Sequence, residues 1–312
     1  MVPSVAVARW VVTRSLRPPR NTTRLASVVK LSLTRLTSAF AALIAVLGGL
    51  HTAEAAEGQR ADLVNRRVLR VCADPANLPF SNQKGEGFEN KIADIVGEAL
   101  GIPVEYTWFP QATGFIRRTL FAKACDVVIG YAQGDELVLN TNHYYRSTYA
   151  ILYRKGGALD GVESLADERL KGKHIGIVAG TPPGDIMARL GLMAFAKPYP
   201  LMVDRRYESP TERMIEDIRK GEIEAGILWG PIAGYFAGRG GEQLVVKPLL
   251  KESIGPRMTY RITMGVRQGD DLWKRQLNQI IAQNQGKIDK VLLDFGVPLL
   301  DEDNKQITAP RK

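Results

Sequence analysis

The chain contains few of the residues from which metal centres and nucleophilic active sites are usually built. Only 2 of its 312 residues are cysteine and only 3 are histidine. Neither His143 nor His174 has a partner at a spacing typical of metal ligands. The G-x-S-x-G motif of serine hydrolases and the G-x-x-x-x-G-K-[ST] phosphate loop are both missing from the sequence. We therefore expect a non-enzymatic protein with no cofactor and no metal.

A strong excess of one charge is also missing once the N-terminal residues are set aside. The full chain has 42 basic and 33 acidic side chains, a formal net charge of +9. Residues 1–55 hold seven of the basic residues and one acid, which leaves +3 on the other 257 residues. Such a small charge is not the footprint of a nucleic-acid-binding protein. We interpret the pair Arg117 and Arg118, and the pair Arg205 and Arg206, as solvated surface.

Residues 1–55 have the order of parts found in an export signal. The basic residues are followed by the uncharged apolar run Leu36–Leu50 and then by the small-residue site Ala53-Glu54-Ala55. This order predicts a cleaved secretory signal peptide and a mature protein in the periplasm, without a stable membrane anchor. The apolar run is short and rich in Ala and Gly for a membrane span. A retained anchor is the alternative.

The two cysteines, Cys72 and Cys125, both follow the predicted cleavage site. Disulfides persist in exported proteins, and an even number of cysteines is compatible with one bridge. Each cysteine lies in or beside a predicted strand, so a bridge requires those strands to be neighbours. We predict this bridge; two small buried thiols are the alternative.

The mature chain alternates strands and helices, which is typical of an α/β fold with mostly parallel sheets. One helix has apolar residues at the i, i+4, i+7 and i+8 positions, beginning at Phe88 and stopping at Gly101. The capping sequence Ser209-Pro-Thr-Glu212 opens another helix, which ends at Gly221. The predicted strands cover residues 68–73, 103–109, 126–130, 144–154, 173–179, 225–229, 244–250 and 260–266. The predicted helices cover residues 88–100, 113–123, 184–190, 210–220, 272–283 and 288–295.

The two α/β units predict two lobes, joined by a two-stranded hinge near residues 148–154 and 250–260. We expect residues 66–150 and 256–304 to form the first lobe, residues 155–249 to form the second, and residues 305–312 to be a polar tail. A cleft between lobes is a common place for a ligand.

Candidate cleft residues follow the predicted strands, because ligands of open α/β sheets gather at the carboxyl ends of the strands. Many of them are aromatic, which favours an aromatic-walled cleft, although aromatic side chains also pack in cores. The helix start at Thr181-Pro-Pro-Gly184 is a weakened anion site, because its two prolines lack backbone N–H donors. The candidates are Asn77, Leu78, Phe80, Phe88, Glu89, Asn90, Trp108, Phe109, Tyr131, Tyr149, Thr181 and Trp229.

Three long segments in the expected order resemble a known family. They read "RVCADPANLPFSNQKGEGFENKIA", "YTWFPQATGFIRRTLFAKACDVVIG" and "ILWGPIAGYFA". They look like the J-type proteins of bacterial methanol oxidation, a quinoprotein-dehydrogenase-associated group of solute-binding proteins (family 3). The resemblance covers nearly the whole mature chain and implies a two-lobed periplasmic binding protein-like fold of type II. It also implies that a quinoprotein methanol dehydrogenase is the partner, helped in its assembly or activation.

The sequence departs from the amino-acid-binding branch of this superfamily. That branch places a Thr-x-x-Arg motif after its third strand, and the Arg pairs with the carboxylate of the ligand. The equivalent segment, Gly134–Leu139, has no basic residue, so binding of an ordinary amino acid is not expected. The leading hypothesis is therefore a protein-binding accessory factor. The alternatives are a receptor of an ABC importer for a small solute and an enzyme with a site around Cys72, Glu89 or His143.

Overall fold

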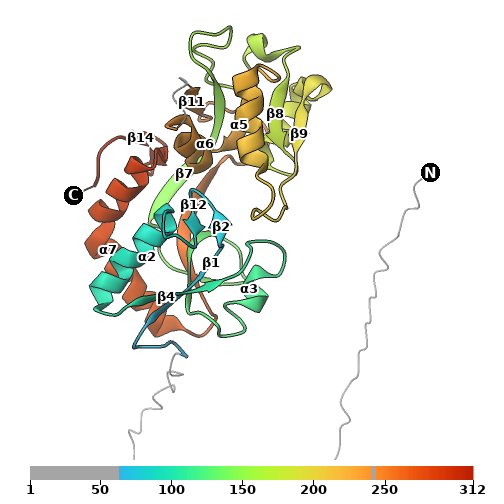
Figure 1. The fold of residues 1–312 in the computed structure, drawn as a ribbon. Coiled ribbons are helices and arrows are strands. Elements are labelled where there is room, and N and C mark those ends of the chain that lie inside the picture. Colours follow the sequence, from blue (N-terminus) through green and yellow to red (C-terminus); the bar gives the residue numbers. More distant parts are fainter. Residues whose placement is uncertain (1–62, 240–243, 312) are drawn as a thin grey trace, which may run out of the picture. The chain divides into compact units, whose positions relative to one another are not determined.

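The computed structural model describes residues 63–239 and 244–311. The predicted signal peptide lies outside these residues. The described residues form two lobes, each with a parallel sheet and its own helices (Figure 1). None of the helices in these ranges is long and apolar enough to cross a membrane.

The first lobe is built on three parallel strands whose central strand carries Cys72. β1 (Leu69–Ala73) pairs with β4 (Val104–Trp108) on one side and with β5 (Val127–Ala132) on the other. The helices α2 (Phe88–Leu100) and α7 (Asp271–Asp294) pack together beside this sheet (Figure 1). The short elements of this lobe are β2 (Ala76–Asn77), β3 (Ser81–Asn82), α3 (Phe115–Arg118), β6 (Leu139–Asn140), β13 (Leu299–Leu300) and β14 (Gln306–Ile307).

The second lobe has the same plan. Its parallel strands are β8 (Ile175–Val178), β9 (Lys197–Tyr199) and β10 (Ala225–Trp229). The helix α5 (Pro210–Lys220) begins at Pro210, and the side chain of Ser209 accepts a hydrogen bond from the backbone N–H of Glu212, as the capping sequence predicts. The other elements are η1 (Glu168–Leu170), α4 (Pro182–Arg189), η2 (Leu192–Phe195), α6 (Gly230–Ala237) and β11 (Leu244–Pro248).

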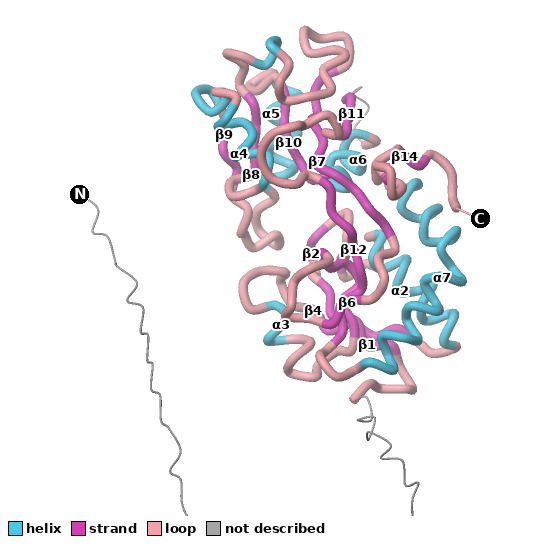
Figure 2. Tube along the Cα trace, turned by 180° about the vertical axis from the view of Figure 1, so that it is seen from behind, coloured by secondary structure: helices cyan, strands magenta, loops and turns pink. Residues whose placement is uncertain are grey.

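Two long antiparallel strands join the lobes into one sheet. β7 (Tyr145–Arg154) pairs with β12 (Thr259–Val266) up to Thr148, and from Tyr149 onward it pairs with β10 and β11. The return crossing runs beside it, since Thr148 Oγ1 donates to the carbonyls of Leu249 and Met258 at 3.3 and 3.1 Å. Figure 2 shows β7 and β12 side by side between the lobes.

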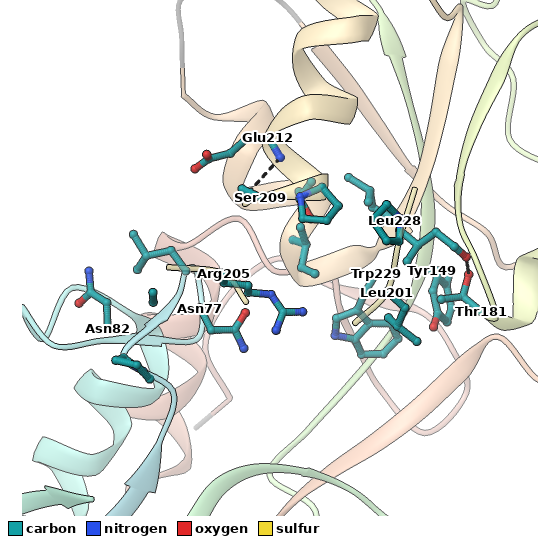
Figure 3. Close-up of a pocket in the computed structure, with 18 of the residues that line it drawn as sticks. Asn77, Asn82, Tyr149, Thr181, Leu201, Arg205, Ser209, Glu212, Leu228 and Trp229 are labelled. Carbon is teal, nitrogen blue, oxygen red and sulfur yellow. Dashed lines mark hydrogen bonds between the residues drawn. The ribbon is translucent and has the colours of Figure 1, made fainter. Parts of the chain in front are cut away.

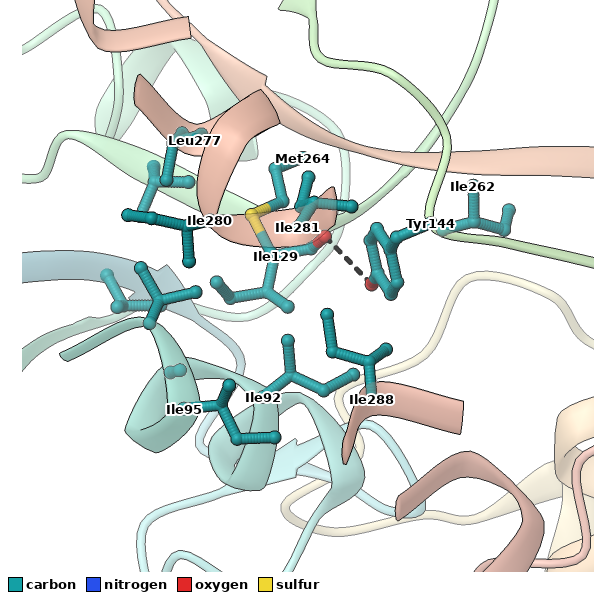
Figure 4. Close-up of a cluster of buried hydrophobic side chains, with 14 of the residues drawn as sticks. Ile92, Ile95, Ile129, Tyr144, Ile262, Met264, Leu277, Ile280, Ile281 and Ile288 are labelled. Carbon is teal, nitrogen blue, oxygen red and sulfur yellow. Dashed lines mark hydrogen bonds between the residues drawn. The ribbon is translucent and has the colours of Figure 1, made fainter. Parts of the chain in front are cut away.

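The core of the first lobe explains why α2 and α7 lie together. Ile92 of α2, Ile129 of β5 and Ile288 of α7 are each at most 1% exposed and belong to one cluster (Figure 4). The hydroxyl of Tyr144 donates to the carbonyl of Ile129 at 3.0 Å and so satisfies the polar end of a fully buried ring. Burial of a large apolar side chain stabilises a fold by about 1.5–3 kcal/mol.

The predicted disulfide is confirmed. Cys72 and Cys125 are bonded, with their Cα atoms 5.4 Å apart, because β1 and β5 are neighbouring parallel strands. Asp126, the next residue, is buried and accepts from the guanidinium groups of Arg70 and Arg267 at 2.7 Å each. Arg267 also donates to the carbonyl of Cys125 at 2.6 Å. The bridge and this ion cluster together fix the start of β5.

Two helix predictions were wrong. The helix predicted over residues 113–123 is only α3, because Gly114 precedes it with φ of 91° and the hydroxyl of Thr119 donates back to the Phe115 carbonyl. The two helices predicted after residue 272 are the single helix α7, which continues through Gly286. A Cβ at Gly286 would lie 2.7 Å from the carbonyl oxygen of Arg311, so the glycine permits close backbone approach rather than ending the helix.

The C-terminal segment makes specific contacts with the first lobe, which a solvated polar tail would not make. β14 pairs with β13, and Arg311 donates to the buried carboxylate of Asp289 at 2.7 Å. Upstream, Glu302 accepts from Arg261 at 2.7 Å and bonds His143 at 2.8 Å. The domain boundaries remain a proposal: residues 66–150 and 256–304 form the first lobe, and residues 155–249 form the second.

Replacing both cysteines with alanine should lower the free energy of unfolding. The bridge spans 53 residues of sequence, and a loop of that length corresponds to about 4 kcal/mol in the chain-entropy description of disulfides. Urea unfolding of the Cys72→Ala/Cys125→Ala variant measures this loss. A reductant should lower the stability of the wild type by a similar amount and leave the variant unchanged; a wild type insensitive to reductant contradicts the prediction.

Candidate interlobe ligand site

A cavity of about 420 Å³ lies between the two lobes. The first lobe contributes the loop after β1, residues 75–84, and the second contributes the ends of its strands and the loop before α5. Figure 3 shows Asn77 on one side and Thr181, Leu201 and Trp229 on the other, with the Arg205 side chain between. The cavity thus has walls from both lobes.

Hydrogen bonds within the first lobe hold the 75–84 loop in shape. The carboxylate of the buried Asp74 accepts from the backbone N–H of Ala76 at 2.9 Å and of Gln111 at 2.6 Å. The Asn77 side chain donates to that of Gln111 at 2.9 Å. Each bond satisfies a polar group removed from water, and the Leu78–Pro79 peptide within the loop is cis. The loop therefore presents Asn77 and Leu78 to the cavity on a fixed backbone.

Three aromatic rings meet where β7 changes its partner. Tyr149 lies opposite Trp229 in the β7–β10 register, and their ring centroids are 5.3 Å apart. Tyr260 of β12 lies 5.8 Å from the ring of Trp229, in an edge-to-face arrangement. Burial of its phenol raises the pKa of Tyr149 to about 12, so its hydroxyl keeps its proton at neutral pH. The rings of Tyr149 and Trp229 form the apolar floor of the cavity, and Tyr260 packs against both.

Arg205 places a cation in the cavity without a bonded carboxylate. Its side chain is half-buried, and within the part of the chain that the structure describes no Asp or Glu forms an ion pair with it. Removal from water lowers the pKa of the guanidinium, and the charge of Asp74 opposes that shift. The prediction that Arg205 and Arg206 are both solvated is wrong for Arg205, whereas the exposed Arg206 bonds Asp204.

A second cavity, of about 190 Å³, lies in the first lobe and shares Trp229 with the larger one. Glu89, a half-buried residue at the start of α2, lines it. The pKa of Glu89 is raised to about 8, mainly by burial and to a smaller extent by the negative charge of the nearby Asp74. The lining residues are Phe80, Glu89, Gln111, Gly130, Tyr131, Ala132, Tyr145, Trp229 and Ile262.

The structure brings eight of the twelve predicted cleft residues into these two cavities. Asn77, Leu78, Tyr149, Thr181 and Trp229 line the larger cavity. Phe80, Glu89 and Tyr131 line the smaller one, together with Trp229. Their roles in binding remain a proposal. Thr181 precedes the two prolines that begin α4, and its hydroxyl donates to the Val178 carbonyl at 2.6 Å.

The other four predicted cleft residues line neither cavity and instead pack within the first lobe. Phe88 is fully buried and packs edge-to-face on Phe80. The side-chain oxygen of the buried Asn90 accepts from two backbone N–H groups of the preceding loop at 3.1 Å each. Trp108 stacks on Tyr106 with centroids 4.5 Å apart, and Phe109 packs beside the disulfide. A residue near a strand end therefore does not always face the cleft.

Sequence reasoning missed Arg205, Gln111 and the apolar residues before α5. These residues lie in loops without a periodic pattern, so only the chain path brings them to the cavity. The basic pair at 205–206 was the one available signal for Arg205. Within residues 63–239 and 244–311, no three His, Cys, Asp or Glu side chains gather as metal ligands would.

Two relatives match most of the chain. Protein MoxJ of Methylorubrum extorquens AM1 is 31% identical over 297 residues, 89% of this chain and 96% of that protein. The chain belongs to the MoxJ family. A second Protein MoxJ, from Paracoccus denitrificans, is 26% identical over 76% of this chain and 91% of that protein. No protein-family model matches the chain.

A solved structure confirms the fold that the sequence predicts. The crystal structure of the periplasmic binding protein XoxJ from Methylobacterium extorquens AM1 has a TM-score of 0.65 and 41% identity to this chain. It covers 75% of this chain, and this chain covers 100% of it. The MoxJ-family chain described here therefore has the two-lobed type II fold of periplasmic binding proteins.

The raised pKa of Glu89 predicts a pH-dependent stability. Between the ordinary Glu pKa of about 4.3 and a folded-state value of about 8, the folded protein holds a proton that the unfolded chain has lost. The free energy of unfolding should therefore fall as pH rises through this window, by at most about 1.4 kcal/mol per pH unit. Glu89→Gln should remove this contribution and gain stability relative to wild type up to pH 8.

Chemical unfolding from pH 5 to pH 9 measures this difference. Glu98→Gln is the matched control, because Glu98 lies exposed on the same helix. It should show the same pH dependence as the wild type. Parallel curves for wild type and Glu89→Gln would show that Glu89 does not hold a proton in the folded state.

Proposed function

We propose that this chain is a periplasmic accessory factor that binds a quinoprotein methanol dehydrogenase in its assembly or activation. Membership of the MoxJ family carries the proposal. The basic and apolar N-terminal segment supports export, and the disulfide suits an oxidising compartment. The protein acts by binding, without a reaction of its own.

The edge of the cavity supports binding of a protein surface. We define the cleft rim as Leu201, Met202 and Tyr207, three apolar residues of the loop before α5. They are 43%, 57% and 85% exposed, and Leu201 lines the larger cavity. Large exposed apolar side chains grouped beside a cavity are typical of interaction sites, and Tyr is enriched in protein interfaces. The cleft rim therefore provides an apolar contact for the dehydrogenase.

The charge inside the larger cavity also favours a protein segment over a free amino acid. The site has the Arg205 guanidinium but lacks the Thr-x-x-Arg anchor after the third strand of lobe one. A carboxylate on the surface of the dehydrogenase would form a charge-assisted hydrogen bond with Arg205. The Arg205 guanidinium has already lost part of its contact with water in the free protein. A carboxylate of the partner would replace the hydrogen bonds that this water made.

A solute receptor of an ABC importer is the second candidate. The observation in its favour is the larger cavity itself, since about 420 Å³ lies within the range of small-molecule sites. Its aromatic floor of Tyr149 and Trp229 would suit a small aromatic or weakly anionic solute. This candidate requires a free ligand, whereas the accessory factor requires only the partner protein.

Replacing Leu201 with aspartate should weaken binding to methanol dehydrogenase at least tenfold. The change places a charge on the cleft rim, where an apolar contact is expected. Leu272→Asp is the matched control, because Leu272 is 38% exposed on α7, away from the cavity. Titration of the purified dehydrogenase, followed by surface plasmon resonance, measures both variants. Failure of the wild type to associate at micromolar concentrations would overturn the accessory proposal.

A thermal-shift screen of small periplasmic solutes distinguishes the second candidate. A receptor should be stabilised by about 2.7 kcal/mol when the ligand is present at a hundredfold above its Kd. The accessory factor predicts a flat response to solutes that would occupy the larger cavity, together with binding to the dehydrogenase. Stabilisation by such a solute that Trp229→Ala removes would favour the receptor instead.

A further inference from the structure

The smaller cavity contains an acidic group for which the described residues supply no counter-ion. Glu89 lies in the first turn of α2 and lines the cavity of about 190 Å³. In the described part of the chain, no Lys, Arg or His forms an ion pair with its carboxyl group, and no donor is hydrogen-bonded to it. A carboxylate that is partly removed from water and has no partner is unfavourable. A cation entering the cavity would relieve this.

Aromatic rings make up most of the remaining wall. Phe80, Tyr131, Tyr145 and Trp229 line the same small space as Glu89. The face of an aromatic ring carries a partial negative charge and attracts ammonium groups, most strongly when both are out of water. Rings combined with one carboxylate form a site that suits a small organic cation better than a neutral or anionic molecule.

The backbone of β5 is shaped to receive the carboxyl group. An added Cβ at Gly130 would lie 1.9 Å from Glu89 Oε1 and 2.9 Å from the carboxyl carbon. Any larger residue at position 130 would therefore displace the acid from its present place. This close fit keeps Glu89 against the strand.

The titratable groups around Glu89 are acids rather than bases. Asp74, at the end of β1, raises the pKa of Glu89 through its negative charge. Tyr145 of β7 and the adjacent Tyr144 are buried phenols whose pKa values are raised, first by burial and in part by Glu89. Tyr106 of β4 feels the same charge, and Tyr131 of β5 donates to Asp135 at 2.6 Å. None of these groups can neutralise a Glu89 carboxylate by supplying positive charge.

We propose that the smaller cavity binds a small alkylammonium cation, with Glu89 as its counter-ion and the rings of Phe80, Tyr131, Tyr145 and Trp229 as its walls. Its volume of about 190 Å³ suits a small cation better than a long polyamine. The smaller cavity shares Trp229 with the larger one, so the two lie side by side. This site is separate from the cleft rim, and the inference does not depend on binding of a dehydrogenase.

Binding of a permanent cation should release a proton. With a pKa of about 8 in the empty protein, Glu89 is mostly protonated at pH 7 and must ionise to pair with the ligand. The affinity should therefore rise with pH, approaching tenfold per unit between pH 6 and the pKa of about 8, and then level off.

Isothermal titration calorimetry with tetramethylammonium chloride tests the proposal, because this cation does not itself titrate. Titrations at pH 7 in two buffers with different enthalpies of ionisation should show release of close to one proton. tert-Butanol, a neutral molecule of similar shape, should bind at least tenfold more weakly. Glu89→Gln should lose at least tenfold in affinity, while Glu98→Gln should bind as the wild type does.

Two further measurements keep the outcome interpretable. Circular dichroism and unfolding at pH 6 check that Glu89→Gln is folded, which is expected because the amide resembles the protonated acid. Gly130→Ala should also weaken binding, by displacing Glu89 while leaving its charge in the chain. The proposal is overturned by no binding of tetramethylammonium at millimolar concentrations, by equal binding of tert-butanol, by equal affinity of Glu89→Gln, or by affinity independent of pH.

Discussion

The pairing of β7 with strands of both lobes is the constraint on which the rest of the structure depends. Its first half is held by β12 and its second half by β10 and β11, and the change falls between Thr148 and Tyr149. A strand cannot shift by one residue without turning its side chains to the other face. The register of β7 therefore fixes the strands of both lobes relative to β7, and with them the loops that form the cleft.

Several features of the site follow from that point of change. Tyr149 and Trp229 face each other there because β7 and β10 are in register, and Tyr260 joins them from β12. Gly230, the next residue after Trp229, allows close packing, since a Cβ there would lie 2.4 Å from the carbonyl oxygen of Thr148. On the first-lobe side, the Cys72–Cys125 bridge ties β1 to the start of β5. The bridge therefore fixes β1, which leads into the 75–84 loop, relative to β5, which contains Gly130.

Periodic patterns allowed much of the fold to be predicted, and irregular segments account for what was missed. The apolar spacing from Phe88 to Leu100 matches α2, and the run Ala225–Trp229 matches β10. The same spacing cannot tell whether Phe88 faces the core or the cleft, because helix phase relative to the sheet is set by tertiary packing. Arg205 lies in the loop before α5. Its charge and its basic neighbour predicted a solvent-exposed side chain, but the path of the loop places it in the larger cavity. Gly286 suggested a helix end, yet it lies within α7, where the absence of a side chain leaves room for the Arg311 carbonyl.

One buried carboxylate links the charges of the two cavities. Asp74 is held by the backbone N–H groups of Ala76 and Gln111, so its position is set by the fold rather than by a ligand. Its charge favours the cationic form of Arg205 and disfavours the anionic form of Glu89. Arg205 therefore keeps a positive charge in the larger cavity, whereas Glu89 in the smaller cavity is mostly protonated at neutral pH. Asp74 thus acts in opposite directions on the two cavities, because one holds a base and the other an acid.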